Sequence, residues 1–145
     1  MNLGALFQGT LWRYEMNNMT WHCELILNND EECAGVVDCL TTHVMNHVYH
    51  DCHGNAYTDQ RRVRTYVLSQ FLRGYVEEVT DSENEYSFYR PMTVELILGA
   101  IQEIDFREIA ENLIGDYSPK PAEEVAENEE YFNIMGFGNY DIDED

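Results

Sequence analysis

Apolar residues recur at spacings of three and four along most of the chain, and this spacing limits the fold more than any other feature. Between Asp30 and His50 the residues with this spacing are Cys33, Val36, Val37, Leu40, Val44, His47 and Val48. Because a helix has about 3.6 residues per turn, side chains spaced in this way lie along one face. We expect a helix over this segment, capped by Asn29 or Asp30, with Glu31 and Glu32 favourable in its first turn.

Three further segments have the same spacing. One runs from residue 58 or 59 to about 78, and another covers residues 92–104 after Pro91, which suits a first helical position. The segment 105–115, DFREIAENLIG, begins at Asp105, whose carboxylate is suited to capping, and its glycine can end a helix. We expect a mainly α domain, a compact bundle of about four helices.

The stretch GTLWRYEMNNMTWHCELILNN has two readings. Apolar and polar residues alternate moderately well, so Asn17 and Asn18 could turn a short N-terminal β-hairpin. Alternatively, Thr20 caps a short helix that carries Trp21 and Leu25.

The chain changes character after Tyr117. Residues 118–145 contain two prolines, nine acidic residues and one basic residue. Such a segment has too little apolar surface to order itself, apart from the aromatic run YFNIMGFGNY. We expect residues 1–117 to form a single globular domain, and residues 118–145 to form a flexible acidic tail with an aromatic docking segment. On this reading, deletion of the tail leaves the domain folded.

The net charge is the strongest global signal. The chain has 28 acidic and 8 basic residues, a formal charge of −20. Residues 1–76 hold eight acids and five bases, a net of −3, whereas residues 77–145 hold twenty acids and three bases, a net of −17. Such a surface repels nucleic acid and anionic membranes, so the expected partners are basic protein surfaces or cations. A net charge of magnitude about 2–8 is enough to keep a small domain soluble. The much larger negative charge of this chain therefore suggests that the charge itself has a function.

Carboxylates on helices can take the place of phosphates. From residue 103 to residue 116 five acids and Arg107 give a net charge of −4. This segment is roughly 20 Å long as a helix, over which duplex DNA has about 12 charges. One helix therefore has too few charges to imitate a duplex. Carboxylates from several helices must come together, or a homodimer must supply a second set. The candidate partner-binding residues are Glu77, Glu78, Asp81, Glu83, Glu85, Glu95, Glu103, Asp105, Glu108, Glu111 and Asp116.

The stretch CLTTHVMNHVYHDCHGN is rich in histidine and cysteine. Neutral imidazoles and thiolates are the ligands of structural zinc, although the stretch lacks a C-x₂-C pair. The candidate zinc ligands are Cys39, His43, His47, His50, Cys52 and His53. The alternative is a polar helix edge, with the cysteines as small core residues. No secretory leader or membrane-length apolar run is evident, so we expect a cytoplasmic protein with reduced thiols.

Arg61, Arg62 and Arg64 cluster at the expected start of a helix. In a chain of this charge we expect them to pair internally with acids, and we expect no direct binding of nucleic acid. The sequence has no nucleophile elbow, P-loop or dinucleotide glycine pattern, and its carboxylates isolate no catalytic pair. The expectation is therefore that the protein is not an enzyme.

Two stretches, TWHCELILNNDEE and DFREIAENLIGD, together resemble a family of small acidic proteins common in phages and mobile elements. That family opens with Thr-Trp…Leu…Asn-Asp-Glu and closes with Asp-Trp-x-Glu-Ile-Ala-Glu-x-Leu-Ile-x-Asp. The two stretches cover 25 of the 145 residues, with Phe106 in the aromatic place. The matching positions are Thr20, Trp21, Leu25, Asn29, Asp30, Glu31, Asp105, Glu108, Ile109, Ala110, Glu111, Leu113, Ile114 and Asp116. The family has no established activity, so the resemblance implies a mobile-element setting and no catalytic residue.

These features favour a non-enzymatic acidic decoy, a DNA mimic. It would occupy the basic nucleic-acid channel of a host defence protein such as a restriction or CRISPR complex, in the host cytoplasm. Exposed tyrosines would serve as amphipathic anchors, namely Tyr75, Tyr86, Tyr89, Tyr131 and Tyr140. The alternative is a small zinc-stabilised regulatory or adaptor domain, and a third reading is an acidic chaperone for a basic partner.

Overall fold

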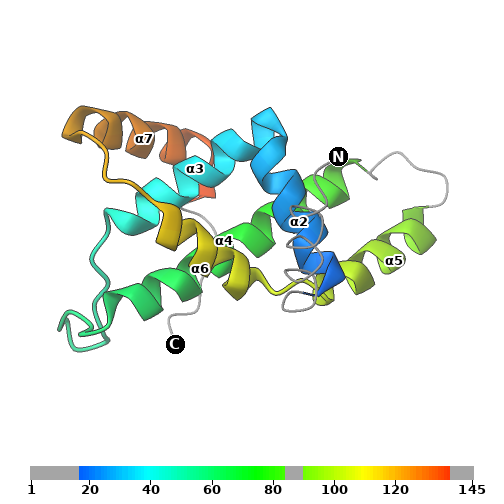
Figure 1. Ribbon diagram of the computed structural model, residues 1–145, viewed down its shortest axis with the longest axis horizontal. Coiled ribbons are helices and arrows are strands. Elements are labelled where there is room, and N and C mark those ends of the chain that lie inside the picture. Colours follow the sequence, from blue (N-terminus) through cyan, green and yellow to red (C-terminus); the bar gives the residue numbers. More distant parts are fainter. Residues whose placement is uncertain (1–16, 84–89, 138–145) are drawn as a thin grey trace, which may run out of the picture.

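The chain folds into helices packed around a long central one. The computed structural model describes residues 17–83 and 90–137, with the backbone alone at 81–83 and 90–94. Within these ranges there are six helices, which are α2 (Asn18–Asn29), α3 (Glu31–Met45), α4 (Gln60–Glu83), α5 (Arg90–Gln102), α6 (Phe106–Asp116) and α7 (Ala122–Ile134). Figure 1 shows α6 crossing α4, α7 lying along α3, and α5 at the far end of α4. The expected mainly α fold is confirmed, with more helices than the four or so predicted.

The N-terminal segment is helical where the structure describes it. The Asn17 side chain accepts a hydrogen bond of 2.9 Å from the Thr20 backbone N–H, so Asn17 is the N-cap of α2. The hairpin is therefore wrong for residues 17–29, and its first arm lies outside the described residues. Thr20, which was expected as the cap, lies instead in the first turn of the helix, where its hydroxyl accepts a hydrogen bond of 2.7 Å from the Asp105 backbone N–H.

The start of α3 agrees with the sequence. The Asp30 carboxylate accepts a hydrogen bond of 3.0 Å from the Cys33 backbone N–H, which confirms Asp30 as the cap. The same hydrogen bond lowers the pKa of Asp30, because it stabilises the ionised form. Glu31 and Glu32 occupy the first turn, as expected.

The end of α3 differs from the prediction. The helix ends at Met45, so the expected continuation to His50 is wrong. The Asn46 side chain donates a hydrogen bond of 2.8 Å to the Thr42 carbonyl and ends the helix there. Beyond it, the Gln60 side chain accepts from the N–H of Tyr49 and donates to its carbonyl. This pair of hydrogen bonds holds the following loop in a non-helical path.

The other three predicted helices are present with shifted ends. The segment predicted at residues 92–104 is α5, which begins at Arg90 and ends at Gln102. The segment predicted to end near residue 78 continues as α4 to Glu83. The Asp105 carboxylate accepts from the Glu108 backbone N–H at 3.2 Å, which confirms the cap of α6. The helix runs through Gly115 to Asp116 instead of ending at the glycine.

The core forms where α3, α4 and α6 meet. Leu40, Leu68, Leu72 and Ile109 are fully buried. Burying a leucine or isoleucine side chain contributes about 1.5–3 kcal/mol, so this cluster dominates the stability of the fold.

The largest difference from the sequence analysis lies after Tyr117. Residues 122–134 form the helix α7, where a flexible tail was expected. Two aromatic side chains explain the difference, because Phe132 and Phe137 are each only 3% exposed and pack with Phe71 in the core. The aromatic segment therefore docks on the chain's own core. This packing also reverses the expected effect of deleting residues 118–145, which should now lower stability.

Phe132→Ala tests whether α7 contributes to the fold. The substitution should lower the free energy of unfolding by about 3–5 kcal/mol, because it removes a buried aromatic ring. Its neighbour Tyr131 is 48% exposed, so Tyr131→Ala should change stability by less than about 1 kcal/mol. Urea denaturation followed by circular dichroism measures both. Equal, small effects would mean that α7 does not pack on α3.

Candidate functional site

An exposed row of carboxylates runs along α7. Glu123, Glu127 and Glu130 are exposed and are spaced by four and three residues. At about 100° per residue they lie within about 60° of one another around the helix axis. Phe132 lies roughly opposite them, and it is buried. We call these three residues the α7 stripe.

Contacts with α3 fix the direction in which the α7 stripe points. Nδ1 of His43 lies 2.8 Å from a carboxylate oxygen of Glu129, and the imidazole stacks on Phe132 with ring centroids 3.7 Å apart. One turn away, the Asn128 side chain donates a hydrogen bond of 3.0 Å to the Cys39 carbonyl. These contacts turn one side of α7 towards α3 and leave the stripe facing outward.

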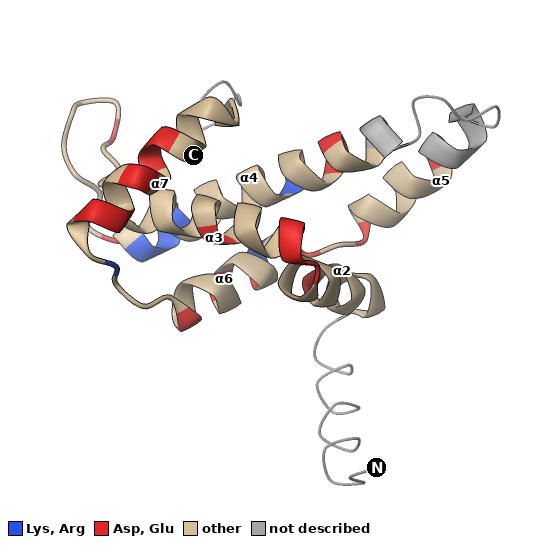
Figure 2. Cartoon of the chain, turned by 90° about the horizontal axis from the view of Figure 1, so that it is seen from above, with Lys and Arg blue, Asp and Glu red and all other residues tan. Residues whose placement is uncertain are grey.

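The charge density along α7 approaches that of one nucleic-acid strand. Glu124, which is also exposed, flanks the stripe. The four glutamates from Glu123 to Glu130 span about 10.5 Å at 1.5 Å per residue, or about one charge per 3.5 Å. One strand of duplex DNA has one charge per about 3.4 Å. Figure 2 shows acidic residues along α7 and no basic residue within that helix.

The predicted acidic set is divided among three helices. Among its members with described side chains, Glu77, Glu78 and Glu95 are exposed on α4 and α5. The remainder lie on α6 or just before it, and they do not share one face, since Glu111 and Asp116 are about 140° apart around the helix. Asp81 and Glu83 have only their backbone described, and Glu85 lies outside the described residues.

The sequence analysis missed the glutamates of α7, because that segment was expected to lack structure. The spacing of acidic and apolar residues in this segment does indicate a helix. Acids at 123, 127 and 130 alternate with Val125, Asn128 and Phe132, which is the pattern of a helix with one buried face. The composition of the segment outweighed this pattern in the prediction.

The predicted tyrosine anchors have different surroundings. Tyr75 is only 9% exposed and packs against Phe137 in the core, so it cannot act as a surface anchor and its prediction is wrong. Tyr131, in contrast, is exposed beside the α7 stripe. Tyr86, Tyr89 and Tyr140 lie outside the described residues.

The candidate zinc ligands are not brought together. Within residues 17–83 and 90–137, no three side chains of His, Cys, Asp or Glu form a group that could hold a metal ion. Cys39 is buried against α7, His43 is bonded to Glu129, and His47 stacks on His43. The helix on which the expected spacing relied ends before His47.

The other three candidates lie in or beside the loop between α3 and α4, and all are exposed. The Asp51 carboxylate accepts hydrogen bonds from the backbone N–H groups of His53 and Asn55, and Gly54 has a φ of 80°. His50 forms an isolated bridge with Ala56. This hydrogen bonding accounts for the loop without a metal.

Burial also makes two thiols poor metal ligands. It raises the pKa of Cys39 to about 11, and the nearby carboxylates of Glu129 and Asp38 act in the same direction. Burial likewise raises the pKa of Cys23 to about 11. Because the thiolate is the form that binds zinc, both cysteines are better described as core residues.

Alkylation of the native protein by iodoacetamide at pH 8 tests this assignment. Cys52 is exposed and should react readily, whereas Cys23 and Cys39 should react at least about 100-fold more slowly. Mass spectrometry of peptides measures each rate. One equivalent of zinc should leave the rates unchanged, and joint protection of Cys39 and Cys52 by zinc would support a metal site.

Comparison with protein-family models, with curated proteins and with solved structures gives no match to this chain. The resemblance to a phage family therefore stays a prediction.

In the structure the two resembling stretches are in contact. The Asn112 side chain donates a hydrogen bond of 3.1 Å to Glu24, and the Asp105 backbone N–H donates one to Thr20. No helix in the described part of the chain is both long and apolar enough to cross a membrane.

Proposed function

We propose that this protein is a non-enzymatic acidic decoy that occupies the basic nucleic-acid channel of a host defence protein and inhibits it. The observation that carries the proposal is the α7 stripe. It is an ordered row of exposed carboxylates, and together with the flanking Glu124 it has nearly the axial charge density of one nucleic-acid strand.

The order of the row supports mimicry better than acidity alone would. Flexible acidic side chains on a disordered tail lose conformational entropy when they bind. In α7 the backbone is already fixed by the contacts of Phe132, Asn128 and Glu129 with α3. The partner therefore meets carboxylates that keep their spacing, as phosphates in a duplex do.

Binding would proceed by charge. The chain's net charge of −20 would steer it towards a basic channel, where arginines and lysines pair with the carboxylates of α7. Ions that neutralise the channel are released at the same time, as when a protein binds DNA. Tyr131, exposed at the end of the stripe, supplies an amphipathic contact.

The stripe imitates only a short length of one strand. A duplex-binding channel contacts a longer surface, so exposed acids on other helices, such as Glu77 and Glu78 on α4, must contribute or a second copy must extend the row. A homodimer is therefore part of the proposal.

Capture from a bacterial lysate on immobilised full-length chain tests the proposal. Nucleic-acid-binding proteins should be retained at low salt, and duplex DNA should displace them, because both ligands occupy one channel. The affinity of a purified captured protein should fall steeply with salt. Glu127→Gln with Glu130→Gln should make the slope of log affinity against log salt less steep, because two screened ion pairs are lost.

The matched control is Glu31→Gln with Glu32→Gln, which removes the same charge from exposed positions on α3. It should change the slope by much less than the α7 variant. Binding that is insensitive to salt would contradict mimicry. A stable ternary complex of captured protein, DNA and this chain would contradict it too, and would favour an adaptor role.

A further inference from the structure

The arginines near the start of α4 do not pair with acids as expected. In the described part of the chain, no acid lies within ion-pairing distance of Arg61, Arg62 or Arg107. Arg64 instead donates hydrogen bonds to the carbonyl of His47. The predicted internal pairing is therefore wrong for these residues, although the chain has more than three acids for every base.

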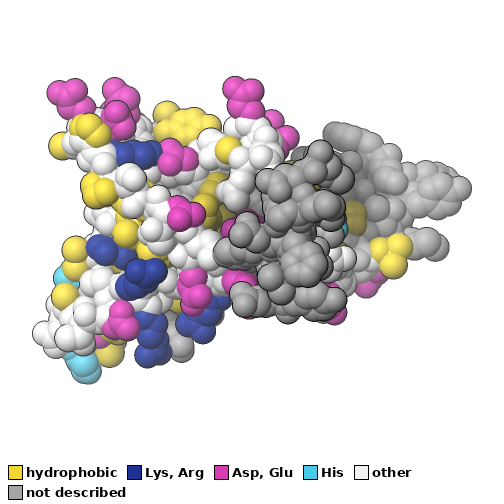
Figure 3. Space-filling view, viewed as in Figure 1, with side chains coloured by type: hydrophobic (Ala, Val, Ile, Leu, Met, Phe, Trp, Pro, Cys, Tyr) yellow, Lys and Arg dark blue, Asp and Glu magenta, His cyan; other side chains and the backbone are white. Residues whose placement is uncertain are grey.

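The same arginines gather on one surface. Arg62 and Arg107 line a hollow of about 200 Å³, and both also line a neighbouring, more open hollow together with Arg61. Figure 3 shows basic side chains clustered at the end of the molecule where α4 begins, with acidic side chains interspersed among them. Within a strongly acidic protein this is a local region of opposite charge.

The packing of α6 on α4 creates this cluster. Arg62 lies in the first turn of α4, and Arg107 lies in the first turn of α6. The Arg61 guanidinium lies against Gly115 in the last turn of α6, where the free carbonyls of the helix attract a cation. Arg61 lines only the neighbouring hollow, while Arg62 and Arg107 line both.

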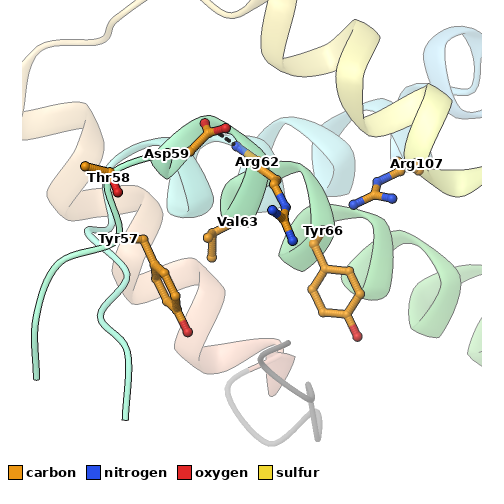
Figure 4. Close-up of a pocket in the computed structure, with 7 residues that line it drawn as sticks. All are labelled: Tyr57, Thr58, Asp59, Arg62, Val63, Tyr66 and Arg107. Atoms are coloured by element: carbon orange, nitrogen blue, oxygen red, sulfur yellow. Dashed lines mark hydrogen bonds between the residues drawn. The ribbon is translucent and has the colours of Figure 1, made fainter. Parts of the chain in front are cut away.

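The walls of the smaller hollow suit a small organic anion. Figure 4 shows the Arg62 guanidinium between the rings of Tyr57 and Tyr66, with Arg107 reaching towards it from α6. Thr58 also lines the hollow. Asp59 and Val63 complete the lining, and we call these seven residues the arginine hollow.

Two acids must be weighed against these arginines, and one of them, Asp59, lines the smaller hollow itself. The Asp59 carboxylate accepts a hydrogen bond of 3.1 Å from the Arg62 backbone N–H, so it is occupied in capping α4. Glu111 lines only the neighbouring hollow, with Arg61, Arg62 and Arg107. The smaller hollow is therefore lined by two arginines and one aspartate, a net charge of +1.

We propose that the arginine hollow binds a phosphate group, either free phosphate or the phosphate monoester of a small organic molecule. Two guanidinium groups and a hydroxyl are donors that match phosphate oxygens, and arginine binds phosphate in a bidentate manner. The tyrosines supply flat surfaces on which a sugar or base can pack. A long nucleic acid does not fit, because the net charge of −20 repels a polyanion beyond the hollow.

Titration of the full-length chain with inorganic phosphate and with adenosine monophosphate tests the proposal. Proton–nitrogen correlation spectra, recorded at low salt in phosphate-free buffer, should show saturable shifts of the backbone signals of Thr58, Arg62 and Arg107. Tighter binding of the nucleotide identifies a phosphate monoester as the ligand, and equal binding identifies free phosphate. Arg62→Gln with Arg107→Gln should weaken binding at least about tenfold.

The control is Arg64→Gln with Arg73→Gln, which removes the same charge from α4 at positions that do not line the hollow. It should change the affinity less than about threefold. An equal loss of affinity in both variants would overturn the proposal. It would mean that the anion responds to the total charge of the protein and not to the residues of the hollow. Absence of saturable shifts with either probe would overturn it, as would binding of single-stranded RNA without binding of the small phosphates. Circular dichroism verifies that all variants are folded.

Discussion

The hydrogen bond from the Asp105 backbone N–H to the Thr20 hydroxyl fixes where α6 begins, and much of the surface depends on it. Thr20 is fully buried, so its hydroxyl needs a partner inside the protein. With Asp105 held in this way, the next residue, Phe106, is buried. Arg107 then follows in the first turn of α6 and reaches the hollow beside Arg62. A core contact between α2 and α6 thereby determines where two surface charges meet.

The charges of opposite sign are held by different parts of the core. The packing of α7 on α3 through Phe132 and His43 directs the α7 stripe outward. The arginine hollow depends on the packing of α6 on α4. The two surfaces lie on different helices, so separate substitutions can alter them. The folded chain thus has two charged surfaces of opposite sign, the α7 stripe and the arginine hollow.

Features that depend on neighbours in the sequence were predictable. The caps at Asp30 and Asp105 each bond to a backbone N–H three residues later, so the residue pattern alone indicates them. The path of the chain after α3 was not predictable, because it depends on Gln60, eleven residues beyond Tyr49. Likewise, composition predicted a flexible tail, whereas α7 is ordered by α3, more than 80 residues earlier in the chain. The candidate site was missed for the same reason, since its row of charges exists only once α7 has packed.

The distance in sequence between α3 and α7 also bears on the order of folding. The contacts of His43 with Glu129 and of Cys39 with Asn128 join residues 86 and 89 positions apart. Contacts of such separation close large loops and tend to form late, after local helices and their nearest neighbours. During synthesis, α3 is complete long before the residues that cover it have been made. The nascent chain therefore has an uncovered apolar face on α3, and it gains its row of carboxylates only in the last step of folding.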